Sequence, residues 1–376
     1  MGFQRNGLLP TLPGVVICLL GVLSQLFIGR RLRIPKLLNY GFALLLLLAF
    51  FGVGEQLIES LARALGPYYR DLTTGMAALC CVALIASAAM LLLRDQVPSF
   101  NSERRQFLRV STAAACAAPI GVLGAGIITR KDFRINELEI KFPNLPKDLQ
   151  GLRLLQLSDI HIGAFFTASD LARVVDASNQ LRADLAFITG DLITTKYDPL
   201  DRCLLELRRL RSTSGIWGCM GNHELYSKVQ AYTAAKAREL DMRFLRREAE
   251  SLRFGQSRIN LVGVDFERRA PYLEGIEELV ARDQFNLLLS HTPEVFPVAA
   301  KKGFDLTLSG HTHGGQINLE LLGTNLNVVD LHMPYTKGLY TLPKSAVYVN
   351  SGLGTIGIPV RIGAPPEITL IRLCSS

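Results

Sequence analysis

The sequence predicts an α/β domain built from a sandwich of β-sheets, preceded by an α-helical membrane region. Three observations lead to this prediction. Apolar and basic residues concentrate in the first third of the 376-residue chain. From residue 131 onward, short apolar runs of strand length alternate with segments of helical spacing. Polar residues follow several of the predicted strands directly, where their side chains can gather on one edge of a sheet.

The charge distribution separates the two parts of the chain. Residues 1–130 contain 12 Lys or Arg and 5 Asp or Glu, whereas residues 131–376 contain 29 and 28. The formal net charge of +8 therefore belongs almost entirely to the first third. Because the C-terminal part is almost neutral, a nucleic-acid-binding surface is not expected there. The hydrophobic fraction of 49% favours a membrane region at residues 1–130.

Four nearly uncharged apolar runs predict transmembrane helices, because crossing a hydrocarbon core takes roughly 17 to 25 helical residues. The runs are residues 8–28, 37–53, 76–93 and 110–129. The last run contains Pro119 and is rich in Ala and Gly, so three or four spans are expected.

The loops between these runs predict the orientation. Basic residues fill the first and third loops, which places those loops in the cytoplasm. We therefore expect a multi-pass protein of the cytoplasmic (inner) membrane, with residues 131–376 on the extracytoplasmic side. Arg104 and Arg105 precede the fourth run and resemble a twin-arginine export signal, although a plain basic anchor before a helix explains them equally well.

Residues 131–376 contain an alternating pattern of strands and helices. An edge strand is predicted at residues 135–141, and helices are predicted at residues 168–180 and 199–211. Further strands are predicted at residues 152–157, 184–189, 215–220, 259–264, 285–289, 305–308, 346–349 and 368–373. An insertion at residues 226–240 can cap the polar edge. Arg243, Arg246, Arg247 and Arg253 follow it and either meet an anionic group or form a solvated face, and Arg361 is a further candidate to approach this edge.

Five of the six histidines lie at the ends of predicted strands, interleaved with carboxylates and an amide. These residues are Asp159, His161, Asp191, Asn222, His223, His291, His311 and His313. One histidine in a loop is ordinary, but five at one sheet edge predict a metal site. Oxygen and imidazole ligands suit Mn, Fe or Zn. The seven cysteines form no ligand-spaced pair, which argues against a thiolate metal site. The pattern indicates a dinuclear hydrolytic centre.

Five short motifs resemble those of the calcineurin-like metallophosphoesterases, in the same order and at similar spacing. They are Asp159-Ile160-His161, Gly190-Asp191, Gly221-Asn222-His223-Glu224, His291 and Gly310-His311-Thr312-His313. The resemblance covers roughly residues 132–373. The segment Gly310–Gln316, Gly-His-Thr-His-Gly-Gly-Gln, is similar to a membrane-associated bacterial branch of that family. The resemblance implies a four-layer α/β sandwich, in which helices flank two β-sheets.

The resemblance also implies a role for each site residue. Asp159, His161 and His313 would bind one metal ion, Asn222, His291 and His311 would bind a second, and Asp191 would bind both. His223 would face the scissile group as a general acid or charge stabiliser. Many relatives have Asp in place of Glu224, so a role for Glu224 in orienting His223 stays open.

The function implied is hydrolysis of phosphodiester or phosphomonoester bonds by a hydroxide that bridges two Mn, Fe or Zn ions. A lipid-linked or envelope-derived phosphoester and the membrane are the expected partners, and nucleic acid is not. One alternative is a pyrophosphate hydrolase acting on a nucleotide-activated lipid A precursor at the cytoplasmic face. The alternative of another class is a non-catalytic, membrane-anchored binding module, against which the complete set of seven ligands argues.

Overall fold

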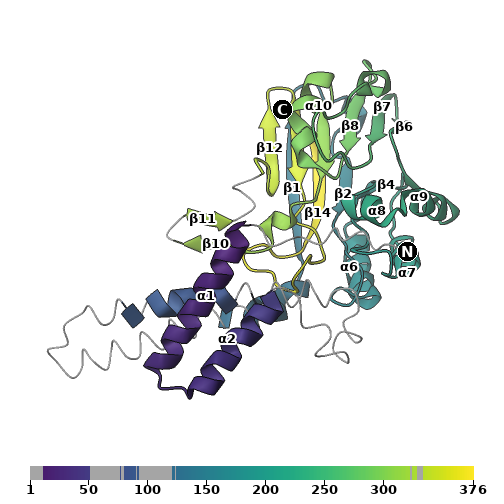
Figure 1. Ribbon diagram of the computed structural model, residues 1–376. Coiled ribbons are helices and arrows are strands. Elements are labelled where there is room, and N and C mark those ends of the chain that lie inside the picture. Colours follow the sequence, from purple (N-terminus) through teal and green to yellow (C-terminus); the bar gives the residue numbers. More distant parts are fainter. Residues whose placement is uncertain are drawn as a thin grey trace. The chain divides into compact units, whose positions relative to one another are not determined.

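The computed structural model describes residues 12–50, 77, 80–89, 91–92, 121–122, 124–321, 324–327 and 333–376 (Figure 1). The chain divides into two compact units, Met1–Ala125 and Gly126–Ser376. In the first unit, α1 (Leu12–Arg31) and α2 (Lys36–Phe50) form a helical hairpin. The buried side chain of Asn39 joins them, because its Oδ1 accepts a hydrogen bond from Gln25 and its Nδ2 donates to the carbonyl of Leu26.

The expected multi-pass membrane localisation is wrong. Within the described part of the chain, no helix has both the length and the apolar character needed to cross a bilayer. The 15 residues of α2 rise about 22 Å, against a hydrocarbon core of about 30 Å. The last turn of α1 contains Arg30 and Arg31. Parts of the expected runs lie outside the described residues, namely residues 8–11, 51–53, 76, 78–79, 90, 93, 110–120 and 123, and so do Arg104 and Arg105.

The described part of the second unit contains two six-stranded mixed sheets. In the first sheet β14 is antiparallel to β2, and the other neighbours are parallel. Its strands, in spatial order, are β1 (Arg134–Phe142), β14 (Glu367–Ser375), β2 (Arg153–Leu157), β3 (Leu185–Thr189), β4 (Ile216–Cys219) and β5 (Met242–Phe244). The prediction of an edge strand at residues 135–141 is confirmed by the position of β1.

The second sheet has a parallel centre and two antiparallel edge strands. Its order is β12 (Gly338–Leu342), β13 (Ser345–Val349), β9 (Leu306–Ser309), β8 (Phe285–Leu289), β7 (Ser257–Gly263) and β6 (Glu248–Phe254). A separate hairpin is formed by β10 (Asn318–Leu321) and β11 (Thr324–Asn327). The sequence did not predict β5, β10 and β11, which have only three or four residues, or β6 and β12, whose residues are mostly exposed.

The central strands are apolar runs because both of their faces are buried. Every residue of β3, β8 and β9 is buried, which is typical of parallel strands covered on both sides. Side chains from the two sheets form one core, in which Phe187 and Trp217 of the first sheet pack with Leu287 and Tyr348 of the second. The two sheets therefore form the sandwich that the sequence predicted.

Helices cover the outer faces of the two sheets (Figure 1). The helices of this unit are α6 (Ala168–Gln180), α7 (Leu200–Leu207), α8 (Asn222–Ser227), α9 (Gln230–Glu239) and α10 (Phe296–Lys302). α6, α7 and α9 pack on the first sheet, where Leu171 and Leu204 contact the core around Ala186. α10 packs on the second sheet through Ala299. The predicted helix at 168–180 is confirmed, whereas the one at 199–211 ends at Leu207.

Candidate metal centre

All eight residues predicted for the site follow the carboxyl ends of strands. Asp159 and His161 follow β2, Asp191 follows β3, and Asn222 and His223 begin α8 directly after β4. The second sheet contributes His291 after β8, and His311 and His313 after β9. Because β2, β3 and β4 are parallel, as are β8 and β9, their carboxyl ends meet at one edge of each sheet.

The first group of donor atoms contains Asp159, His161 and His313. One ligand atom from each lies within 4.8 Å of the other two. The Nε2 atoms of His161 and His313 are 3.1 Å apart, and His313 Nε2 is 3.4 Å from Asp159 Oδ1. His161 Nε2 is also 3.6 Å from Asp191 Oδ2. All four side chains are buried, so these polar atoms face one another and not solvent.

The second group contains Asp191, His291 and His311, again within 4.8 Å. His291 Nε2 lies 3.1 Å from Asp191 Oδ2 and 3.1 Å from His311 Nδ1. Asn222 Oδ1 is also 3.1 Å from His291 Nε2. A third group, formed by His161, Asp191 and His223, shares residues with the first two. Asp191 therefore lies between the two main groups.

The donor atoms fit bound cations better than they fit hydrogen bonding alone. His291 Nδ1 is 2.7 Å from the carbonyl oxygen of Thr189, which can only accept, so Nδ1 holds a proton. At most one further proton resides on Nε2, yet three acceptors of Asp191, Asn222 and His311 surround that atom. A divalent cation satisfies all of these lone pairs at once, and imidazole with oxygen ligands suits Mn, Fe or Zn.

Burial keeps three of the imidazoles neutral, which is the form that binds a metal ion. It lowers the pKa of His161 to about 3 and the pKa of His311 to about 3. It also lowers the pKa of His313 well below its usual value. These nitrogens therefore keep their lone pairs at neutral pH.

His291 and Asp191 behave as an ion pair. Burial acts to lower the pKa of His291, but the carboxylates of Asp191 and Asp159 outweigh it and raise that pKa to about 10. Burial acts to raise the pKa of Asp191, but His291 and His223 hold it well below its usual value. For Asp159, burial is the main cause of a pKa raised to about 6. A bound cation would displace the proton of His291 and stabilise both carboxylates.

Glu224 connects the loops that place two of the predicted ligands. Its carboxylate is completely buried. Among the described residues, it bonds to backbone N–H groups, whereas the ring of His223 bonds to the carbonyl of Thr194. Oε2 accepts hydrogen bonds from the backbone N–H groups of Gly221 (2.8 Å) and Asp191 (3.0 Å), and Oε1 accepts from Leu192 (2.8 Å). Glu224 therefore fixes the loops after β3 and β4 relative to each other.

The backbone around the centre is strained. Five of the predicted ligands have left-handed φ values between 44° and 74°, a conformation that costs a residue with a side chain about 1–3 kcal/mol. They are Asp159, His161, Asp191, His311 and His313. Gly190 has φ +89°, and a Cβ there would lie 2.6 Å from the nitrogen of Gly221. Such clustering of strain is typical of functional sites.

The four arginines that follow the insertion bond to groups away from the centre. Arg243 pairs with Glu250, Arg246 with Asp265, and Arg247 and Arg253 donate to backbone carbonyls of Glu274 and Gly255.

Arg361, in contrast, is buried beside the centre. Its Nη2 lies 3.4 Å from His313 Nδ1, and its guanidinium donates to the carbonyls of Ser351, Gly354 and Ala364. Burial lowers its pKa to about 10, so it remains a cation at neutral pH.

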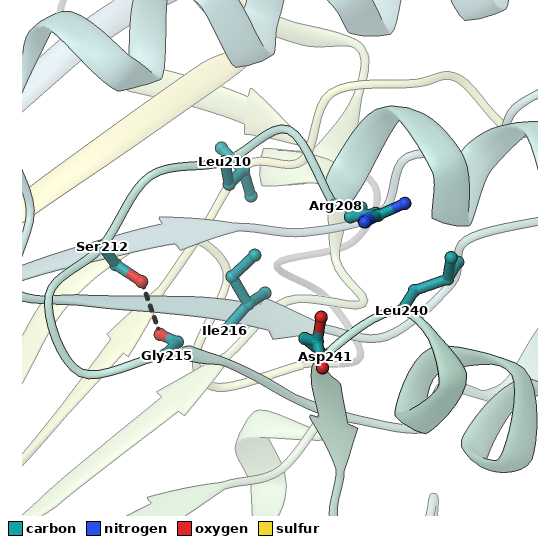
Figure 2. Close-up of a pocket in the computed structure, with 7 residues that line it drawn as sticks. All are labelled: Arg208, Leu210, Ser212, Gly215, Ile216, Leu240 and Asp241. Carbon is teal, nitrogen blue, oxygen red and sulfur yellow. Dashed lines mark hydrogen bonds between the residues drawn. The ribbon is translucent and has the colours of Figure 1, made fainter.

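A pocket of about 210 Å³ lies away from the predicted site. Figure 2 shows its lining residues, among them Arg208, Ser212, Gly215, Ile216 and Asp241. Ile216 is the first residue of β4, whereas the predicted ligand Asn222 follows the last. The pocket and the donor atoms thus lie at opposite ends of this strand.

Comparisons with known proteins agree with the geometry. Residues 152–315 match the family model of the calcineurin-like phosphoesterases. A metallophosphoesterase of Campylobacter jejuni is 32% identical over 244 residues, which are 64% of this chain and 63% of that protein. This alignment spans less than two thirds of the Campylobacter protein. A metallophosphoesterase of Helicobacter pylori strain J99 is 29% identical over 379 residues, 96% of each chain.

The metallophosphoesterase YkuE of Bacillus subtilis is 30% identical over 281 residues, which are 73% of this chain and 98% of YkuE. The match covers nearly the whole of that relative. The residues that match the family model, 152–315, include all the donor residues described above. This chain therefore belongs to the calcineurin-like phosphoesterase family, a family of metal-dependent phosphoester hydrolases.

Proposed function

We propose that residues 131–376 form a hydrolytic domain that binds two metal ions and cleaves phosphodiester or phosphomonoester bonds. Asp159, His161 and His313 hold one ion in this proposal. Asn222, His291 and His311 hold the other, and Asp191 contributes to both. Mn, Fe and Zn are the ions that suit these ligands.

The position of Asp191 is the observation that supports this proposal most. Its Oδ2 lies 3.1 Å from His291 Nε2 and 3.6 Å from His161 Nε2, and these two nitrogens belong to different donor groups. A carboxylate placed in this way can be shared by two ions, as in dinuclear hydrolytic centres.

Ions bound in such a centre supply Lewis acidity and make a water-derived nucleophile available at neutral pH. The residues of the chain hold the ligands in place. The Asp159 carboxylate accepts from the backbone N–H of His311 (3.0 Å), and His291 donates from Nδ1 to Thr189. Burial raises the pKa of Cys203 and Cys219 well above the usual value, so these thiols are unsuited to act as nucleophiles.

His223 is the proposed general acid or charge stabiliser. Its Nδ1 lies 2.7 Å from the carbonyl oxygen of Thr194, so Nδ1 donates there and Nε2 remains for the substrate. Its backbone N–H donates to Asp191 Oδ1 (2.9 Å), which ties it to the centre. His223 is also partly exposed, whereas six of the seven proposed ligands are buried, and a substrate oxygen can therefore reach it.

Metal removal from the purified full-length chain tests the proposal. We expect about two ions per chain by elemental analysis, and hydrolysis of bis-p-nitrophenyl phosphate that is lost on chelation and restored by Mn²⁺. Fe²⁺ and Zn²⁺ added in parallel identify the preferred metal. Undiminished hydrolysis by the metal-free protein would contradict the dinuclear centre.

One further substrate and the metal content separate the alternatives. A nucleotide diphosphate ester, assayed beside the diester, tests for a pyrophosphate hydrolase. Stoichiometric metal binding with no turnover of any phosphoester would favour the non-catalytic binding module.

A further inference from the structure

Two aromatic side chains border the proposed metal centre without being part of it. Tyr226 lies on α8, three residues after His223, and its ring centroid is 6.0 Å from that of His223. Phe266 lies in the loop after β7, with its ring centroid 5.4 Å from His311 and 6.2 Å from His291. The two aromatic rings are themselves 6.3 Å apart. We call this pair the aromatic wall.

The chain holds Phe266 in place from both sides. Asp265 accepts from Arg246 at Nε (3.1 Å) and at Nη2 (2.8 Å), in a forked arrangement that fixes direction as well as distance. On the other side, Glu267 accepts from the backbone N–H of Leu273 (2.8 Å), whose side chain is completely buried. Phe266 therefore does not depend on contact with a substrate for its position.

The aromatic wall lies where the centre is open. His223 and His311 are the partly exposed members of the centre, and they are among the residues that the two rings contact. Tyr226 is itself 56% exposed, and Phe266 is half-buried. Apolar rings left exposed beside a few converging polar groups are the usual composition of a small-molecule site.

The aromatic wall is next to the residue that would serve an ester oxygen. In the proposed function His223 serves the ester oxygen of the substrate, which would place the group carried by that oxygen beside His223 and the rings next to it. The rings beside His223 can then stack on a planar group attached to that oxygen, in the offset or edge-on arrangements that aromatic pairs prefer.

Resting on the proposed function, we propose that Tyr226 and Phe266 determine substrate specificity by binding a planar aromatic ring carried by an ester group of the substrate. An aryl ester and a nucleotide base share this chemistry. The roles of the two residues are in binding, and they take no part in proton transfer.

The test is calorimetric binding to the Mn²⁺-loaded full-length chain, using two pairs of ligands that differ in one ring. Phenylphosphonate is compared with methylphosphonate, and adenosine 5′-monophosphate with ribose 5-phosphate. We expect the ring to tighten binding by about three- to tenfold in at least one pair, the usual size of such a contact. The pair that shows the larger effect identifies an aryl ester or a nucleotide as the source of the ring.

Variants test whether the aromatic wall causes the tighter binding of the ligands that contain a ring. Phe266→Ala should remove most of it, while metal content and the affinity for methylphosphonate stay as in the wild type, which shows that the variant is folded. Tyr226→Ala should reduce the preference, and Phe266→Tyr and Tyr226→Phe should retain it. Tyr232→Ala is the matched control, because Tyr232 is an exposed tyrosine on the neighbouring α9 that bonds to Asp201.

Equal binding of both members in each pair would overturn the specificity role, as would a preference that survives Phe266→Ala and Tyr226→Ala together. If the wild type hydrolyses bis-p-nitrophenyl phosphate in either case, the proposed function stands and only the aromatic wall is rejected. If no ligand binds and no diester is hydrolysed, the proposed function fails and the aromatic wall fails with it.

Discussion

The two ends of strand β4 differ in character although only four residues separate them. Beyond its carboxyl end lie Asn222 and His223, within a buried cluster of donor atoms on strained backbone. At its amino end lies the open pocket with Arg208 and Asp241 (Figure 2). Both ends contain charged side chains, but only the carboxyl end has them desolvated and converging. Convergence and desolvation, and not the presence of a cavity, therefore identify the functional edge.

The difference has a physical origin in the sheet. Parallel neighbours β2, β3 and β4 end at one edge, so the loops after them meet and bury one another's polar groups. Buried polar groups must find partners, and here the partners are other donors and Glu224. At the amino end the polar groups remain in contact with water, which screens them.

Replacing Asp191 should produce the largest effect, because this carboxylate belongs to the second donor group and lies 3.6 Å from His161 of the first. We expect Asp191→Asn to lower kcat/KM for bis-p-nitrophenyl phosphate by about 10³-fold or more, and to reduce the bound metal. Asp241→Asn makes the same chemical change at the opposite end and is the control. Normal turnover and metal content in Asp191→Asn would show that the donor side chains gathered beyond the carboxyl end of β4 do not form the catalytic centre.

Replacing His223 should cost less, since the metal ligands remain. His223→Gln should keep the metal content of the wild type and lower kcat by about 10²- to 10⁴-fold, the usual contribution of a positioned general acid. Elemental analysis and steady-state kinetics on the same preparation check this. Loss of one ion per chain in this variant would instead identify His223 as a ligand.

Replacing Glu224 tests whether metal binding needs the buried carboxylate that joins the loops after β3 and β4. In Glu224→Gln the amide nitrogen would face backbone N–H groups that now donate to a carboxylate oxygen. We expect Mn²⁺ affinity to fall by about 10- to 100-fold, as for other groups that orient metal ligands. Excess Mn²⁺ should restore much of the activity. The control is Glu239→Gln, which changes an exposed glutamate on α9. Unchanged Mn²⁺ affinity in Glu224→Gln would show that Glu224 does not orient the metal ligands.

Changes at the pocket should have the smallest effect. Arg208→Ala and Asp241→Asn alter surface charges that face solvent, so we expect the free energy of unfolding to change by less than about 0.5 kcal/mol. Turnover should equal that of the wild type. A clear loss of activity in either variant would show that the amino end of β4 also takes part in function.

The membrane prediction was wrong, whereas the residues predicted for the site do lie together in three groups of potential ligand atoms. The reason lies in what each pattern measures. Apolar runs in residues 1–130 report composition, and composition does not fix where a helix begins and ends. Within the described residues, α2 is shorter than a membrane span. The positions of the histidines, in contrast, were predicted from the strands that precede them. A strand that is buried on both faces must consist of apolar residues, so its end can be recognised in the sequence.

The sequence by itself determined which strands end in metal-binding residue types. Those signals are local, because a buried strand and the loop after it are adjacent in the chain. Only the tertiary structure decided that β14, from the end of the chain, lies between β1 and β2. It also decided that Glu224 binds backbone N–H groups from two loops, and that Phe266 lies against His311. Apart from the local bond between Glu224 and Gly221, these contacts join residues more than thirty positions apart, and tertiary packing, not any local preference, brings them together.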